Sequence, residues 1–316
     1  MGEHDRSLVI SAYDFIARSR PESLAPRLIL RFGDMPTSKA LRQWLAALPE
    51  CPQLVVDGGF DWNEPTRQAA ALVRANPVAL AAALAKSAAA ERDQGWVEGW
   101  QAADAAANAA VTDTLADDSG LSEPAVHAAL GGLYGDGELV YTASSMPIRD
   151  QEAFLPSGPA AVRFLANRGA NGIDGLVSSG IGAAVASGSP AWIVTGDLGL
   201  HHDSNALAAL RHAPAPVRIV VLNNDGGGIF EHLPQAGQLE REEFEAVLAT
   251  PLGFDVGSLA AAYGVAHRQV ESIEELGTAS REGTGVIEVP IDRAANVALR
   301  NRLTEAAVAA VEDALG

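Results

Sequence analysis

Two segments decide the fold: AWIVTGDLGL at residues 191–200 and VRIVVLNNDGGG at residues 217–228. Each segment places a continuous run of apolar residues, of the kind that forms a buried strand, directly before a short polar stretch. Similar apolar runs occur at 139–142, 162–165 and 286–289, and helical patterns separate them. Strands that are apolar throughout and alternate with helices are typical of a doubly wound parallel α/β sheet, with helices on both faces.

The front of the chain carries a second, smaller α/β pattern. Apolar runs at 27–32 and 53–57 predict two strands, and helical patterns follow them. An alanine-rich segment at 91–120 keeps a helical period, which indicates a connecting helix. We therefore expect part of an α/β domain at 1–90, a connecting helix and linker at 91–120, and the main sheet domain at 121–316.

Composition excludes some classes of function. The 316 residues contain 22 Lys and Arg against 40 Asp and Glu, which gives a formal net charge of −18. Such a chain is a poor partner for nucleic acid, because binding to a phosphate backbone needs clustered cations. Cys51 is the single cysteine, so an internal disulfide is excluded and a reducing compartment is favoured. The start lacks the pattern of a signal peptide, and no apolar run approaches a membrane span, so we expect a cytoplasmic protein.

The polar residues after the two central strands form the most informative pair. Asp197 follows one strand and Asn224 follows the next, 27 residues later, which is about the length of a single helix-plus-strand crossover. If the two strands are neighbours, a carboxylate and an amide meet beside the glycines at 226–228. A few oxygen ligands beside bare backbone suit Mg²⁺ that also binds substrate phosphates. Either motif alone is better explained by a helix cap or a turn, but both together, at crossover spacing and at strand ends, favour a site.

The same residues resemble a known family. Gly-Asp followed by Asn-Asn at this interval resembles the thiamine-diphosphate-binding motif, and longer stretches are similar to the 2-succinyl-5-enolpyruvyl-6-hydroxy-3-cyclohexene-1-carboxylate synthase family of menaquinone biosynthesis. These stretches are RLILRFGDMPTSKAL at 27–41, SSMPIRD at 144–150, NRGANGIDG at 167–175, TGDLGLHHDSNAL at 195–207 and NNDGGGIFEHLPQ at 223–235. The resemblance covers nearly all of the main domain, and it implies the thiamine-diphosphate-binding fold of a diphosphate domain, preceded by part of the family's central domain.

The resemblance also implies which residues bind what. Mg²⁺, or Mn²⁺ in its place, would be held by the side chains of Asp197 and Asn224 and by the backbone carbonyl of Gly226. Thiamine diphosphate would contact Ser145, Ile173, Gly196, Leu198, Gly226, Gly227, Ile229 and Phe230. The substrates would contact Ser145, Arg149 and Arg168. Because both substrates of the family are dianions, arginines suit them, since a guanidinium binds a carboxylate through two hydrogen bonds.

The reaction implied by the resemblance is a transfer. Thiamine-dependent decarboxylation of 2-oxoglutarate is followed by addition of the succinyl-semialdehyde carbanion to isochorismate. The family places its cofactor between this domain and a pyrimidine-binding domain of another subunit, in a dimer or tetramer. Nothing in this sequence corresponds to the pyrimidine domain, which carries the glutamate that activates the cofactor. We therefore expect the chain to be a fragment, from a truncated gene or a split subunit, that is inactive alone.

Two departures and two alternatives accompany this interpretation. Ser144 stands where the family is expected to have Asn, and Gly199 where it often has Ser.

The chain could instead be a non-catalytic module that binds thiamine diphosphate and Mg²⁺. It could also belong to another thiamine enzyme that uses 2-oxoacids, such as an acetolactate synthase or a decarboxylase. Arg149 and Arg168 discriminate here, because two dicarboxylic substrates need them more than pyruvate does. A nicotinamide site and a zinc site fit the motifs less well.

Overall fold

The computed structural model describes residues 5–59, 64–87, 93–118, 120–167 and 172–316. The chain divides into two compact units, each with its own parallel sheet. One unit consists mainly of Leu115–Leu303 and contains six strands. The other combines Arg6–Thr114 with Thr304–Gly316 and contains three strands.

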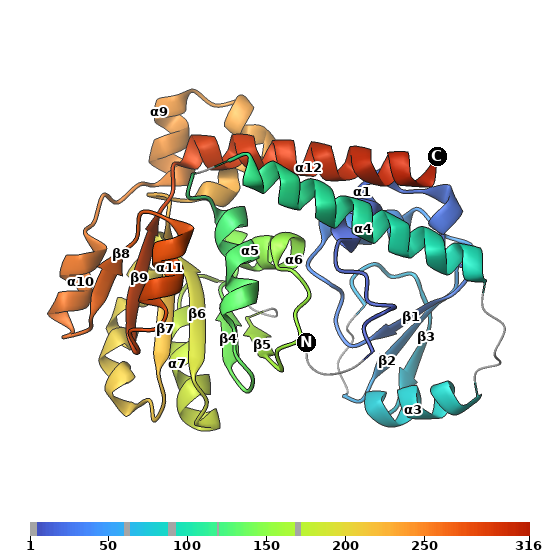
Figure 1. The fold of residues 1–316 in the computed structure, drawn as a ribbon, viewed down its shortest axis with the longest axis horizontal. Helices are drawn as coiled ribbons and strands as arrows, with labels where there is room; N and C mark the ends of the chain where they lie inside the picture. Colours follow the sequence, from blue (N-terminus) through green and yellow to red (C-terminus); the bar gives the residue numbers. More distant parts are fainter. Residues whose placement is uncertain (1–4, 60–63, 88–92, 119, 168–171) are drawn as a thin grey trace. The chain divides into compact units, whose positions relative to one another are not determined.

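The larger sheet has the strand order β5-β4-β6-β7-β9-β8, and all of its strand pairs are parallel (Figure 1). Its strands are β4 (Leu139–Thr142), β5 (Arg163–Ala166), β6 (Ala191–Gly196), β7 (Val217–Asn223), β8 (His267–Gln269) and β9 (Gly285–Pro290). The four central strands β4, β6, β7 and β9 are nearly continuously buried, as their uninterrupted apolar sequences predict. The doubly wound parallel sheet is therefore confirmed.

Side chains alternate between the two faces of this sheet and build two hydrophobic cores. Ile193 and Ile219 belong to one core, whereas Trp192 and Val220, the residues beside them in sequence, belong to the other. The first core is completed by helices α7 and α10, and the second by α5 and α11. The helices of this unit are α5 (Glu123–Leu133), α6 (Met146–Phe154), α7 (Leu176–Ser187), α8 (Asp197–His202), α9 (Arg241–Phe244), α10 (Val256–Ala262), α11 (Ile273–Ala279) and the first part of α12 (Arg293–Leu315), up to Leu303.

Some helical segments between the strands are not regular α-helices. The segment after α8 is a 3₁₀ helix, η2 (Ser204–His212). The segment at 241–249 begins as α9 and continues as a π-helical turn, η5 (Glu245–Ala249). Two further 3₁₀ turns, η3 (Gly228–His232) and η4 (Pro234–Gly237), follow the glycine run. These compact turns let the chain stay close to the end of β7 after the strand has ended.

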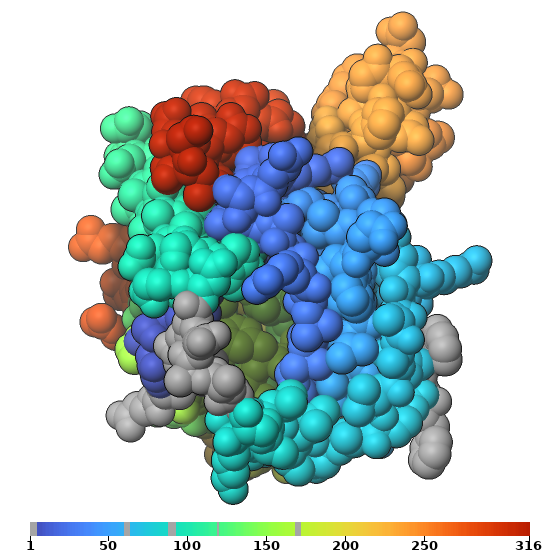
Figure 2. Space-filling model, turned by 90° about the vertical axis from the view of Figure 1, so that its right-hand side faces the viewer, coloured from blue at the N-terminus to red at the C-terminus, as the bar shows by residue number. Residues whose placement is uncertain are grey.

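The smaller unit contains the sheet β1-β2-β3, with β1 (Ile29–Phe32), β2 (Gln53–Asp57) and β3 (Ala69–Arg74). Its helical elements are α1 (Tyr13–Ser19), η1 (Glu22–Leu24), α2 (Lys39–Ala46), α3 (Pro77–Ser87) and most of α4 (Gln94–Ala116). Ser38 caps α2, because its side chain accepts a hydrogen bond from the Leu41 amide at 3.0 Å. Helix α3, which is cyan in Figure 2, lies on the surface of this unit, and none of its residues is buried.

The division into units does not follow the limits expected at residues 90 and 120. Helix α4 packs within the smaller unit, where Ala103 and Ala107 are fully buried and the Asp104 carboxylate accepts a hydrogen bond from the Ala12 amide at 2.7 Å. The last residues of α12 also belong to this unit. A helical period indicates a helix but not the sheet against which the helix packs. None of the helices in the described ranges is long and apolar enough to cross a membrane.

A buried ion pair fixes α6 within the larger unit. Asp150 of α6 is fully buried, and its carboxylate pairs with the guanidinium of Arg300 of α12. The same guanidinium lies over the ring of Phe154, 5.1 Å from the centroid. Removal of one partner from a buried pair leaves an uncompensated charge, so this contact is expected to be important for the position of α6.

We predict that Arg300→Met lowers the free energy of unfolding by about 3 kcal/mol or more, because the Asp150 carboxylate then stays buried without its cation. Arg302→Met is the matched control on the same helix. Arg302 pairs with Asp118 at 2.7 Å, but it is largely exposed, so the loss should be below about 1 kcal/mol. Urea unfolding followed by circular dichroism measures both. Equal losses would contradict the importance of the buried pair.

Candidate functional site

The carboxyl ends of β6 and β7 lie side by side. The two strands pair in parallel, with Gly196 opposite Leu222, so Asp197 and Asn224 follow adjacent strand ends at the same edge of the sheet. Both side chains are buried. The neighbouring strands expected from the single crossover are therefore confirmed, and the carboxylate and the amide face one cavity.

Asp197 is the first residue of α8 and is bonded to the glycine turn. Its Oδ2 atom accepts a hydrogen bond from the backbone amide of Gly226 at 2.8 Å. Burial raises the pKa of this carboxyl from 3.8 to about 6, against the opposing effect of hydrogen bonds from the amides of Gly226, Asp197 and Leu198. A buried carboxylate with a raised pKa lacks a compensating positive charge, and a bound cation would supply it.

The glycine turn after β7 brings bare backbone to the same place. Gly226 has a φ of +140°, and a Cβ atom there would lie 2.5 Å from the Ala249 carbonyl oxygen. At Gly227 a Cβ atom would lie 2.7 Å from the Phe230 ring and 2.8 Å from the Leu248 carbonyl oxygen. Larger residues are therefore excluded by space at both positions and by backbone conformation at Gly226. The turn brings backbone carbonyls close to the cavity, which is suitable for a cation, whereas the amides of Gly226 and Gly227 already donate to Asp197 Oδ2 and to the Ala249 carbonyl oxygen.

The cavity at this edge has a volume of about 330 Å³. All ten residues that the sequence predicts as metal or cofactor contacts line it: Ser145, Ile173, Gly196, Asp197, Leu198, Asn224, Gly226, Gly227, Ile229 and Phe230. The structure thus brings these residues together, although their individual roles remain predictions. Ser145 precedes α6 with a φ of +80°, a conformation that is unusual for a residue other than glycine.

The two predicted substrate arginines do not line the cavity in the same way. Arg149 is exposed on the first turns of α6, and its Nη1 atom donates a hydrogen bond to the carbonyl oxygen of Ser145, which does line the cavity. Arg168 lies outside the described residues. The Ser144 hydroxyl, which replaces an expected Asn, donates to the carbonyl oxygen of Asn167 at 2.8 Å and so connects the ends of β4 and β5.

Glu123 is a residue of the cavity that the sequence did not reveal. It is the first residue of α5, it is 2% exposed, and its Oε1 atom accepts a hydrogen bond from Asn224 Nδ2 at 2.7 Å. The only local signal is Ser122, a typical N-cap residue, followed by Glu and Pro. That signal marks the start of a helix but gives no indication that the glutamate enters a site.

The atoms around this cavity fit Mg²⁺. Asn224 Oδ1 is buried and has no hydrogen-bond partner among the described residues, and Asp197 adds a carboxylate beside it. Hard oxygen ligands in small number, next to accessible backbone carbonyls, are the set that Mg²⁺ uses when phosphates supply the rest. The described residues contain no cluster of three His, Cys, Asp or Glu that could hold a metal. A site that relies on an amide, a carbonyl and phosphate oxygens does not need such a cluster.

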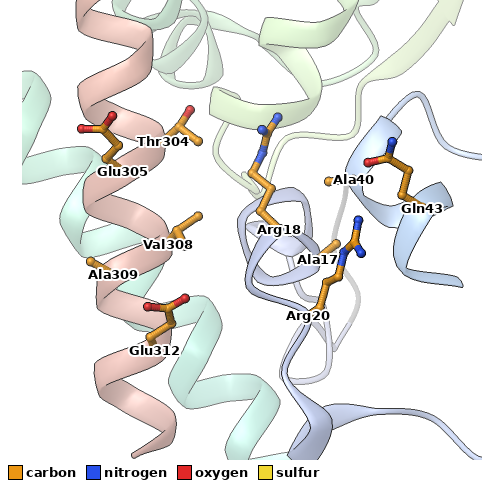
Figure 3. Close-up of a pocket in the computed structure, with 10 residues that line it drawn as sticks. All are labelled: Ala17, Arg18, Arg20, Ala40, Gln43, Thr304, Glu305, Val308, Ala309 and Glu312. Atoms are coloured by element: carbon orange, nitrogen blue, oxygen red, sulfur yellow. The ribbon is translucent and has the colours of Figure 1, made fainter. Parts of the chain in front are cut away.

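A larger hollow, of about 520 Å³, lies in the smaller unit between α1, α2 and the end of α12 (Figure 3). Its charged side chains come from both sides: Arg18 and Arg20 lie at the end of α1, and Glu305 and Glu312 on α12. Arg18 pairs with Asp14 at 2.7 Å. This hollow has no glycine turn and no strand ends, so the smaller cavity at β6 and β7 is the better candidate despite its size.

We predict a pH dependence from the raised pKa of Asp197. The folded state binds a proton at about pH 6 and the unfolded state near 3.8, so protonation stabilises the fold at low pH, and this contribution is lost as the pH rises through 6. We compare the free energy of unfolding of the metal-free chain with that of Asp197→Asn. The difference, unsubstituted chain minus variant, should be about 1 kcal/mol larger at pH 5 than at pH 7.5. Urea titrations at both pH values measure it, and a constant difference would contradict the assignment.

Comparisons with known proteins agree with the geometry. A family model described as the C-terminal TPP binding domain of thiamine pyrophosphate enzymes matches residues 159–289. The 2-succinyl-5-enolpyruvyl-6-hydroxy-3-cyclohexene-1-carboxylate synthase of Bacillus velezensis is 36% identical over 318 residues, which cover 98% of this chain and 54% of that protein. The synthase of the same name from Myxococcus xanthus is 40% identical over 306 residues, which cover 94% of this chain and 51% of that protein. The chain thus spans about half the length of these curated relatives.

Proposed function

Because the chain belongs to the thiamine pyrophosphate enzymes, in the family of the 2-succinyl-5-enolpyruvyl-6-hydroxy-3-cyclohexene-1-carboxylate synthases, we propose that it supplies the diphosphate- and Mg²⁺-binding part of such a synthase. One observation carries the proposal. Asp197 and Asn224 follow adjacent parallel strands and face one cavity beside the glycine turn. This geometry is what a cation bridging protein and diphosphate requires.

The residues of the cavity have separate tasks in this proposal. Asp197, Asn224 and the Gly226 carbonyl would hold Mg²⁺, and the backbone around Gly196, Leu198 and Gly227, with Ser145, would hold the diphosphate. The apolar side chains of Ile173, Ile229 and Phe230 line the cavity where the thiazolium ring would lie. When bound, thiamine diphosphate supplies the nucleophilic carbon and the electron sink for the removal of CO₂ from a 2-oxoacid.

The substrates we propose are 2-oxoglutarate and isochorismate, on which the family's synthase acts. Both are dianions, whereas the chain carries a net charge of −18 and the described cavity residues include no Lys or Arg. Cationic side chains near the mouth of the site must therefore make the local electrostatic potential positive. Arg149 is suited to this task, because it lies one helical turn from Ser145 and is exposed to solvent. Arg168 is the second arginine we propose for the carboxylates.

We also propose that the active form is a homo-oligomer in the cytoplasm, in which a pyrimidine-binding domain completes the site. The share of the relatives that the chain spans, about half, supports a contribution from further protein. Leu30 and Phe32 of β1, and Leu28 just before it, support it as well, because these alternating apolar side chains are 38% to 55% exposed. Cys51 is a free, buried thiol, which agrees with a reducing compartment.

A binding experiment tests the proposed metal site with neighbouring asparagines. We expect Asn224→Ala to weaken the binding of thiamine diphosphate in the presence of Mg²⁺ by at least tenfold, because a buried ligand oxygen is removed. Asn223→Ala is the matched control. The amide of Asn223 donates to Glu288 Oε1 at 2.6 Å, and Asn223 does not line the cavity. Isothermal titration calorimetry measures both, and equal affinities for the two variants would count against the site.

A kinetic experiment tests Arg149, in the chain supplemented with a pyrimidine-binding domain of the family. We expect Arg149→Ala to raise the KM for 2-oxoglutarate about 10- to 100-fold, because a charge-assisted hydrogen bond to a carboxylate contributes about 1.5–3 kcal/mol. Arg281→Ala, an exposed arginine at the end of α11, is the control and should leave KM unchanged. An unchanged KM for Arg149→Ala would remove this residue from substrate binding. Turnover by the unsupplemented chain would contradict the need for a pyrimidine domain.

A further inference from the structure

Glu123 occupies a fixed position at the rim of the sheet. The hydroxyl of Ser122 caps α5 by accepting a hydrogen bond from the Ala125 amide at 3.2 Å, and the Glu123 amide donates to Asn296 Oδ1 at 2.9 Å. The first contact fixes the start of α5, and the second joins it to α12. The Glu123 side chain is 2% exposed and lines the cavity that contains Asp197 and Asn224.

The hydrogen bond between Glu123 and Asn224 sets the orientation of the amide. Asn224 Nδ2 donates to Glu123 Oε1 at 2.7 Å, and both side chains are buried. An ionised carboxylate only accepts hydrogen bonds, so the reverse orientation of the amide would bring two acceptors together. With Nδ2 directed at Glu123, the Oδ1 atom of Asn224 is the one left without a partner among the described residues.

From this contact we propose that Glu123 is a positioning residue, which orients the Asn224 side chain so that its oxygen binds the divalent cation. The inference rests on the proposed function of the cavity and adds the residue that orders one of its ligands. Residues that orient metal ligands through hydrogen bonds have large effects on metal affinity without touching the metal.

A purely structural role of Glu123 makes a different prediction. An acidic residue in the first turn of a helix stabilises the helix through its charge, and a buried acceptor stabilises the fold through its hydrogen bond. The structure contains a matched pair for comparison. Asn223 Nδ2 donates to Glu288 Oε1 at 2.6 Å, and Glu288 is 7% exposed, but neither residue lines the cavity.

Two substitutions of Glu123 separate the acceptor from the charge. Glu123→Gln removes the charge but keeps an oxygen at the same reach, so the Asn224 amide retains its partner and its orientation. Glu123→Asp keeps the charge at the start of α5 but withdraws the acceptor by one methylene group. If Glu123 orients Asn224, Glu123→Asp should weaken metal binding more than Glu123→Gln does. If Glu123 acts through its charge at the helix start, Glu123→Gln should weaken it more.

The experiment is a titration of the full chain with Mn²⁺ at saturating thiamine diphosphate, with free Mn²⁺ measured by electron paramagnetic resonance. Thermal unfolding of each ligand-free variant reports on the fold. We expect Mn²⁺ affinity to fall about 10- to 100-fold in Glu123→Asp, to stay within about threefold of the unsubstituted chain in Glu123→Gln, and to be unchanged in Glu288→Asp.

Three other results would overturn the inference. Unchanged Mn²⁺ affinity in Glu123→Asp would leave Glu123 with a structural role alone, even if the unfolding temperature falls. An affinity loss in Glu123→Gln as large as or larger than that in Glu123→Asp would contradict amide orientation, which requires Glu123→Asp to be the more harmful change. Absence of Mn²⁺ binding by the unsubstituted chain would overturn the proposed function itself, and the inference with it.

Discussion

The parallel pairing of β6 with β7 is the constraint on which the site depends. The register places Gly196 opposite Leu222, so the two strands end at the same edge and their next residues leave the sheet together. Asp197 then starts a helix while Asn224 enters a turn, and the bond from the Gly226 amide to Asp197 Oδ2 connects the two segments.

Electrostatics at this edge is unfavourable without a ligand. Asp197 and Glu123 are both 2% exposed and line one cavity, and burial raises the pKa of Asp197. Such an arrangement reduces the stability of the fold at neutral pH in return for affinity towards a cation. The diphosphate then adds negative charge that the cation also neutralises. A Mg²⁺ ion held in the proposed site would reconcile the acidic composition of the chain with an anionic cofactor.

Much of the fold was predictable from the sequence, because the central strands β4, β6, β7 and β9 are buried on both faces and therefore largely apolar, whereas the short polar edge strand β8 was not predicted. The site residues were predictable for a related reason: Asp197 and Asn224 directly follow such strands. Helix α5 was not predicted, since its eleven residues include Gly131 and Gly132, which weaken a helical pattern. Glu123 was not predicted because its partner, Asn224, is 101 residues away and no local spacing relates them.

The central claim is that Asp197 and Asn224 hold a cation that also binds the diphosphate of the cofactor. Electron–nuclear double resonance of the chain with Mn²⁺ and thiamine diphosphate tests this most directly, because it detects phosphorus nuclei whose phosphate oxygens coordinate the metal. The account predicts strong ³¹P coupling in the unsubstituted chain and its loss in Asp197→Ala under the same conditions. Coupling of the same strength in Asp197→Ala would contradict it.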